Sequence, residues 1–122
     1  MSEFKLIVAG GREFHNYELL SQKLQKLLVN KIANKETVVI VSGGAKGADK
    51  LGEQWASEFN LEIKVFPANW DKFGKSAGYK RNEEMAQFSD ALVAFWDGQS
   101  KGTKNMIDIM KKLNKPVRVI KY

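Results

Sequence analysis

The stretch that most constrains the fold of this chain is a β-branched run that breaks into a glycine-rich turn and then opens a helix. It spans Val38 to Asp49 and reads Val-Val-Ile-Val-Ser-Gly-Gly-Ala-Lys-Gly-Ala-Asp. Glycine lets the backbone reverse with positive φ, and the following helix directs unpaired N–H groups and the positive end of its dipole at the turn. Such a turn either binds an anion such as phosphate or merely joins a strand to a helix.

Two other apolar segments run into turns followed by helices in the same way. Lys5 to Ala9 leads into Gly10-Gly11-Arg12, and Ala91 to Trp96 leads into the polar turn 97–103. The carboxyl ends of parallel strands share one edge of a sheet, and ligands bind there where the strand order reverses. The three turns therefore predict a ligand site at one edge of a parallel sheet.

Hydrophobic periodicity predicts strands and helices in strict alternation. The expected strands are Phe4–Ala9, Thr37–Val41, Leu61–Phe66, Ala91–Trp96 and Val117–Ile120. The expected helices begin near Tyr17, run from the glycine turn to Phe59, from Ala77 to Phe88, and from Gly102 or Thr103 to Leu113. This order predicts an α/β fold, a three-layer Rossmann-like sandwich with a five-stranded parallel sheet in the order 3-2-1-4-5, formed by residues 1–122 as a single domain.

The helix of the glycine turn has a predicted buried face that ends on Trp55 and Phe59, with Asn60 as the left-handed residue after it. The longest irregular stretch is expected at 67–78, again after the carboxyl end of a strand. Trp70 in that stretch has two interpretations. It is a lid or stacking platform for a base, or it covers the core from a loop.

Composition narrows the partners. A formal net charge of +6 and a pI near 9.5 favour an anionic partner, a nucleotide or a nucleic acid, although the lysines are dispersed on helix faces. The chain has no cysteine and a single histidine, which excludes Cys-ligated and multi-histidine metal sites. It has no apolar run long enough for a bilayer and no signal-peptide pattern, so we expect a cytoplasmic protein and no membrane partner.

Five motifs, in order along the chain, carry a family resemblance. They are Ala9-Gly10-Gly11-Arg12-Glu13-Phe14, Ser42-Gly43-Gly44-Ala45-Lys46-Gly47-Ala48-Asp49, Pro67-Ala68-Asn69-Trp70 with Gly74-Lys75 and Ala77-Gly78, Arg81-Asn82-Glu83-Glu84-Met85, and Ala94-Phe95-Trp96-Asp97-Gly98 with Ser100-Lys101-Gly102-Thr103. Together they resemble the YspA-type, cpYpsA-related branch of the SLOG superfamily over nearly the whole chain. The resemblance implies a Rossmann-like domain of phage and bacterial proteins that binds nucleotides or nucleotide-derived ligands.

The resemblance and the residues together define a candidate ligand site of glycines, hydroxyls and charged side chains, with Arg12, Arg81 and Thr103 on the phosphates. The site residues are Gly10, Gly11, Arg12, Ser42, Gly43, Gly44, Gly47, Asp49, Trp70, Arg81, Asn82, Ser100, Gly102 and Thr103. Asp49 either binds a ribose hydroxyl or fixes its turn by accepting backbone N–H bonds. As plain surface residues, Arg12 would pair with Glu13 or Glu18 and Arg81 with Glu84.

Three functions follow as hypotheses. The first is binding or sensing of a nucleotide or a derivative such as ADP-ribose or NAD. The wider superfamily suggests the other two, a phosphoribohydrolase that releases free base and a domain that holds single-stranded nucleic acid, the latter favoured by the net charge with Trp70 and Tyr79. We expect no catalytic residue, metal or cofactor, except that Asp71 or Asp97 is a candidate for Mg²⁺ held through a bound phosphate. A homodimer is left open.

The phosphoribohydrolases differ from this chain at one informative position. Their motif places a glutamate three residues after the threonine of the fourth turn, and Met106 stands there in this sequence. A thioether neither transfers a proton nor stabilises an oxocarbenium-like centre. We therefore predict that the chain is not an enzyme of this kind. For such a reaction, Glu83, Glu84 or Asp49 would have to take the place of the missing glutamate.

Overall fold

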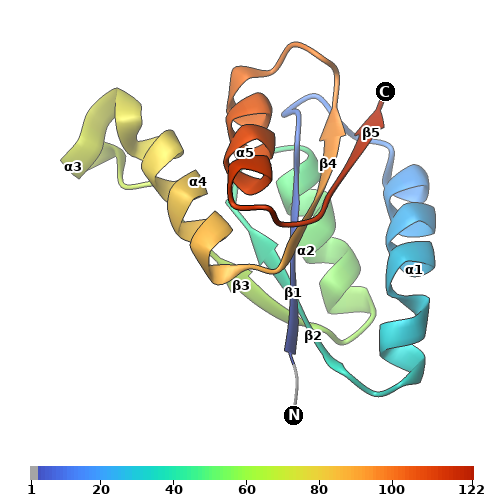
Figure 1. The fold of residues 1–122 in the computed structure, drawn as a ribbon. Coiled ribbons are helices and arrows are strands. Elements are labelled where there is room, and N and C mark those ends of the chain that lie inside the picture. The colour runs from blue at the N-terminus through green and yellow to red at the C-terminus, as the bar shows by residue number, and fades with distance from the viewer. Residues whose placement is uncertain (1–2) are drawn as a thin grey trace.

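The computed structural model describes residues 3–122, which alternate between strands and helices (Figure 1). The strands are β1 (Glu3–Gly10), β2 (Thr37–Ser42), β3 (Glu62–Val65), β4 (Ala91–Trp96) and β5 (Val117–Lys121). The helices are α1 (Tyr17–Ala33), α2 (Ala48–Glu58), α3 (Trp70–Phe73), α4 (Ala77–Phe88) and α5 (Lys101–Lys112), with a 3₁₀ turn at Gly74–Ser76. The α/β class predicted from the sequence is confirmed.

The five strands form one sheet in the order β3-β2-β1-β4-β5, and every neighbouring pair is parallel. β1 lies at the centre, where Ile7 is in register with Val41 of β2 and with Leu92 of β4. The predicted strand order is therefore confirmed, and β1 and β4 lie side by side at the switch point, where ligands bind in open α/β sheets.

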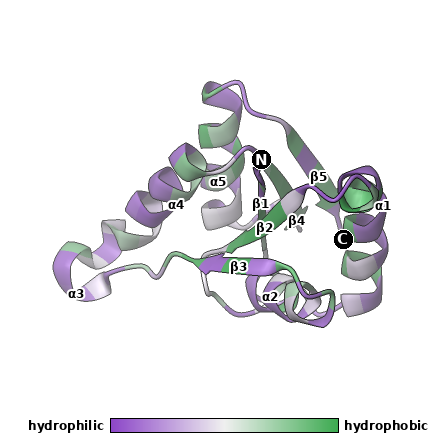
Figure 2. Cartoon of the chain, turned by 90° about the horizontal axis from the view of Figure 1, so that it is seen from below, coloured by the Kyte–Doolittle hydropathy of each residue, from purple (hydrophilic) through white to green (hydrophobic). Residues whose placement is uncertain are grey.

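Helices cover both faces of the sheet (Figure 2). Leu6 and Val8 of β1 face the layer of α1 and α2, while Ile7 and Ala9 face the layer of α4 and α5. This alternation follows from the two-residue period of a strand, and it makes β1 apolar on both faces. Trp55 of α2 is fully buried in the first layer, as predicted.

Two details of the first layer and its edge differ from the sequence prediction. Phe59 was expected inside but is 40% exposed, because α2 ends at Glu58 and Phe59 stands at its C-cap. Its ring stacks on Trp55 at a centroid distance of 4.6 Å. Asn60 has a φ of 57° and is the predicted left-handed residue. The third strand is confined to Glu62–Val65, shorter than predicted, and is exposed along its length at the sheet edge.

The stretch 67–78 was predicted to be irregular, and this is wrong. The Asn69 side chain accepts a hydrogen bond from the Lys72 amide at 3.1 Å and so caps α3, which continues through the 3₁₀ turn into α4. The segment projects beyond the sheet (Figure 1). Trp70 is 54% exposed on it, so the interpretation that Trp70 covers the core is also wrong.

Candidate functional site

The three predicted turns meet at the carboxyl edge of the sheet, and hydrogen bonds connect them. The Gly11 amide donates to the Phe95 carbonyl of β4 at 3.1 Å, and the Gly11 carbonyl accepts from the Ala48 amide of α2 at 3.3 Å. Gly47 has a φ of 81°, and a Cβ there would lie 2.7 Å from the Arg12 carbonyl carbon. Only glycine permits this approach, so the first two turns are held against each other.

A pocket of about 100 Å³ opens where the turns meet. The predicted site residues that line it are Gly10, Arg12, Asp49, Arg81, Asn82, Ser100, Gly102 and Thr103. Ala9, Ala45, Met85 and Met106 complete the lining and were not predicted as site residues. Ala9 and Ala45 lie beside predicted residues in the motifs, and Met85 follows Asn82 by about one helical turn. These spacings could have identified the three residues as part of the site.

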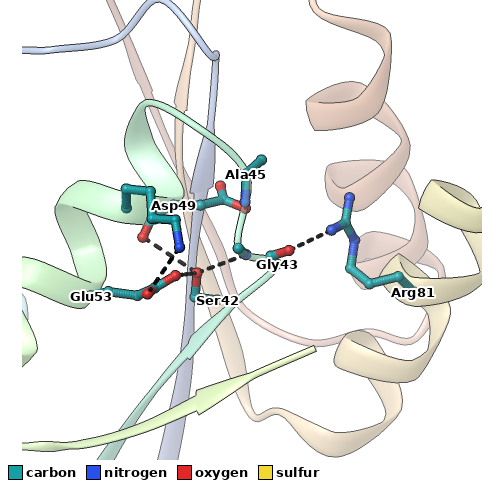
Figure 3. Close-up of polar contacts among 8 residues, drawn as sticks. Ser42, Gly43, Ala45, Asp49, Glu53 and Arg81 are labelled. Carbon is teal, nitrogen blue, oxygen red and sulfur yellow. Dashed lines mark hydrogen bonds and ion pairs between the residues drawn. The ribbon is translucent and has the colours of Figure 1, made fainter. Parts of the chain in front are cut away.

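Groups of the chain itself accept hydrogen bonds from two amides of the glycine turn before α2 (Figure 3). The Gly44 amide donates to the Ser42 hydroxyl at 3.0 Å, and the Ala45 amide donates to the Asp49 carboxylate at 3.3 Å. The Ala48 amide is bonded to the Gly11 carbonyl. Asp49 thus has the turn-fixing role, one of its two predicted alternatives.

Six predicted residues lie outside the pocket lining. Five belong to the first two turns, namely Gly11, Ser42, Gly43, Gly44 and Gly47, and the sixth is Trp70 on α3. Ser42 is fully buried and its hydroxyl donates to the Glu53 carboxylate at 2.6 Å (Figure 3). The first five shape the turns, and direct contact between any of the six and a ligand stays a prediction.

Asp49 brings a buried carboxyl group to the pocket. It is 5% exposed, and burial raises its pKa from the usual 3.8 to about 6. The Ala45 amide and the positive charge of Arg81 oppose this increase, while the negative charge of Glu53 adds to it. The charge of the pocket wall therefore changes near pH 6.

Arg81 of α4 is held in place by its neighbours. One guanidinium nitrogen, Nη1, donates to the Gly43 carbonyl at 2.6 Å (Figure 3). Nε donates to the Asn82 side chain at 3.1 Å. Burial lowers the pKa of Arg81, with Asp49 opposing this effect and the charge of Arg12 adding to it. Arginine nevertheless stays protonated in proteins. Two guanidinium groups therefore act on the same pocket.

The surface ion pairs considered as alternatives for the arginines are not formed. Among the salt bridges of residues 3–122, none joins Arg12 to Glu13 or Glu18, and none joins Arg81 to Glu84. Arg12 is exposed and lines the pocket, so its guanidinium is available to a ligand.

The start of α5 forms the opposite wall. Asn82 connects this wall to α4, because its amide donates to the Gly102 carbonyl at 3.2 Å and to the Asn105 side chain at 2.9 Å. Ser100 is the N-cap, and its side chain makes no capping bond to the helix. The first amides of an α-helix have no partner inside the helix. In α5 these are the amides around Gly102 and Thr103, which line the pocket and are candidates to bind an anion.

Asp71 and Asp97, the two residues considered for Mg²⁺ binding, do not line the pocket. Asp97 accepts hydrogen bonds from the Gln99 and Ser100 amides, each at 2.8 Å, which lowers its pKa and closes the turn before α5. Asp71 is exposed on α3. Within residues 3–122 no three His, Cys, Asp or Glu side chains are grouped as a metal site would require. None of the helices in this part of the chain has the length and apolar character needed to cross a bilayer.

Residues 4–73, which contain the first two turns and the start of the α3 segment, match the family described as YAcAr (YspA, cpYpsA-related SLOG family). The chain belongs to this family. A relative supports the assignment. The gene 61 protein of Mycobacterium phage D29 is 37% identical over 86 residues, which is 66% of this chain and 69% of that protein. The resemblance predicted from the five motifs is confirmed.

Three solved structures share the fold at low sequence identity. DNA processing protein A (DprA) from Streptococcus pneumoniae has a TM-score of 0.71 and 16% identity, and the alignment covers 96% of this chain but 50% of that one. DprA from Helicobacter pylori, whose structure is described by its single-stranded DNA binding mode, has a TM-score of 0.64 and 21% identity over 95% of this chain and 64% of that one. A protein named TM1055 has a TM-score of 0.66 and 19% identity over 96% and 72%. These similarities show the Rossmann-like fold, and this chain spans only half to two thirds of the DprA chains.

Proposed function

We propose that this chain binds a nucleotide or a nucleotide-derived molecule, of the ADP-ribose or NAD kind, with a phosphate in the pocket at the carboxyl edge of the sheet. The observation that carries the proposal is the convergence of Arg12, Arg81 and the start of α5 on one pocket. Guanidinium groups bind phosphate bidentately, and the amides of a helix N-terminus complement its negative charge.

The size of the pocket indicates which part of the ligand it takes. Pockets that enclose a whole drug-sized molecule measure about 300–1,000 Å³. At about 100 Å³ this pocket suits a phosphate group, and a ribose and base would extend beyond its rim. The functional class is thus a phosphate-anchored ligand whose remaining part lies over the neighbouring surface.

Calorimetry with inorganic phosphate, AMP, ADP, NAD and ADP-ribose tests the proposal. We expect saturable binding to at least one nucleotide. Arg12→Ala removes charge-assisted hydrogen bonds worth about 1.5–3 kcal/mol, so affinity should fall about 10- to 150-fold. Arg12→Lys keeps the positive charge but lacks the planar guanidinium, so its affinity should lie between those of the unmodified chain and Arg12→Ala. Lys46→Ala, an exposed cation outside the pocket lining, is the matched control.

Two results contradict the proposal at different levels. Absence of saturable binding to every compound in the panel, with folded protein, rejects nucleotide binding. Equal affinities for the unmodified chain and Arg12→Ala reject the phosphate clamp even where a nucleotide binds.

Single-stranded nucleic acid is the second candidate. The side chains of Trp70 and Tyr79 are 54% and 47% exposed. The lysines 72, 75 and 80 are exposed in the same part of the chain, from α3 to the first turn of α4. Aromatic side chains beside cations bind single strands with little sequence preference. A short oligothymidylate added to the calorimetric panel tests this function, and binding that disappears near physiological salt would indicate non-specific attraction.

A phosphoribohydrolase is the third alternative, and the pocket lining argues against it. Met106 is 1% exposed and lines the pocket at the position where the related enzymes carry glutamate. Glu83 and Glu84 line a different groove, between α4 and α5, so among the described carboxylates only Asp49 lines the pocket. The absence of catalysis, the cytoplasmic location and the single-domain extent stay predictions, and the homodimer stays open.

A further inference from the structure

Gly78 of α4 lies between the aromatic side chain of the projecting segment and the phosphate pocket. A Cβ at this glycine would lie 3.6 Å from Cη2 of the Trp70 ring and 3.8 Å from Nη2 of Arg81. The two atoms are therefore less than 8 Å apart. No side chain at position 78 stands between them, because the residue is glycine.

Arg81 points toward the pocket from one side of this gap. Its Nη1 and Nε are bonded to the Gly43 carbonyl and to Asn82, whereas Nη2 is the atom nearest to the gap. The Trp70 ring therefore comes within 8 Å of a guanidinium nitrogen that a phosphate in the pocket can contact.

Trp70 is available for contact with a ligand. Its side chain is 54% exposed, although a large apolar ring gains free energy from burial. The hydrogen bonds of residues 3–122 include none from its indole N–H, while the other two indoles donate to Ser21 and to the Ser100 carbonyl. A hollow of about 400 Å³, lined by residues 67–71, borders the ring. An exposed indole beside a hollow fits a flat aromatic group.

We propose that Trp70 is the stacking platform for the base of a nucleotide whose phosphate occupies the pocket, and that Gly78 keeps the path between the two subsites open. The inference rests on the proposed function and extends it. The ligand class is a nucleoside phosphate with an unpaired base, and the indole contributes through ring stacking rather than through base-specific hydrogen bonds.

The experiment compares AMP with ribose 5-phosphate, which has the phosphate and the sugar but no base. In Trp70→Ala, AMP affinity should fall about 5- to 140-fold, since base–aromatic stacking is worth about 1–3 kcal/mol and 1.4 kcal/mol corresponds to a factor of ten. Ribose 5-phosphate affinity should not change. Gly78→Leu should have the same selective effect, because leucine favours helices and its side chain fills the gap.

Phe59→Ala is the control, since Phe59 is an exposed aromatic residue at the C-cap of α2 and outside the pocket lining, and both affinities should stay unchanged. Unaltered ribose 5-phosphate binding in each variant shows that the pocket is intact. Equal AMP affinities for the unmodified chain and Trp70→Ala, with ribose 5-phosphate still bound, overturn the stacking platform and leave the proposed function standing. Failure of the unmodified chain to bind these two compounds and every nucleotide of the calorimetric panel refutes the proposed function instead. Where another nucleotide of the panel binds in place of AMP, the same comparison is made with that nucleotide.

Discussion

Replacing Asp49 by asparagine should remove one component of the pH dependence of stability, so that the variant gains stability relative to the unmodified protein as pH rises. The carboxyl group is 5% exposed and its pKa is raised by burial from 3.8 to about 6. Between these two values the folded state binds a proton at Asp49 and the unfolded state does not. Unfolding then releases a proton, so this group's contribution to stability decreases as pH rises from about 4 to about 6.

The magnitude follows from the two pKa values. One pKa unit corresponds to 1.36 kcal/mol, so a difference of about 2 amounts to roughly 3 kcal/mol once Asp49 is ionised in both states. Asparagine keeps the shape of the side chain and an oxygen that accepts the hydrogen bond from the Ala45 amide. The variant loses the charge but also its attraction to Arg81, which the pKa already includes. We expect Asp49→Asn to gain about 1–3 kcal/mol at pH 8 relative to its effect at pH 4.

Urea unfolding of both proteins at intervals from pH 4 to pH 8 measures this difference, because other titrating groups cancel in the comparison. Asp108→Asn is the matched control. Asp108 is exposed on α5 and paired with Lys104, so its effect should vary little with pH. A difference between Asp49→Asn and the unmodified protein that stays constant across the range would refute the reasoning.

Two further expectations can be tested. Gly47→Ala places a Cβ against the Gly11 and Arg12 backbone at a φ of 81°, so it should lower the free energy of unfolding in urea by about 1–3 kcal/mol or more. Gly102→Ala has open space beside it and should lower that free energy little. Similar losses for the two variants would contradict the close approach at Gly47. After incubation of the protein with nucleoside monophosphates, chromatography should detect no free base. Turnover that survives repurification and disappears in Asp49→Asn would show that Asp49 takes the place of the glutamate that the related enzymes use.

The strand order could be predicted because each central strand contains a continuous apolar run. The runs are Leu6–Ala9 in β1, Val38–Val41 in β2 and Ala91–Trp96 in β4, and each leads into a polar or glycine-rich turn, so the pattern indicates both their burial and the edge at which the turns meet. Most of the predicted pocket residues, such as Arg12 and Thr103, lie in those turns, whereas Arg81 and Asn82 come from α4.

The features that were missed depend on contacts between distant parts of the chain or on a local cap. The sequence around Ser42 is compatible with a free phosphate turn. Asp49 was one predicted acceptor for the turn amides, but only the folded chain shows the Gly11 carbonyl bonded to the Ala48 amide. Likewise, Phe59 fits a buried helical stripe, but its position at the end of α2 leaves it exposed. For α3 the signal was local, since Asn69 is a favoured N-cap residue that was interpreted as part of a loop.

The hydrogen bond between the Ala48 amide and the Gly11 carbonyl has a consequence for the kinetics of binding. It fixes the backbone of two pocket-forming turns to each other before a ligand arrives. The entropy lost in ordering that backbone is then lost during folding and not again during association, which is the condition for a preorganised site. A phosphate should therefore associate in a single fast phase, with rearrangement confined to side chains such as the exposed Arg12.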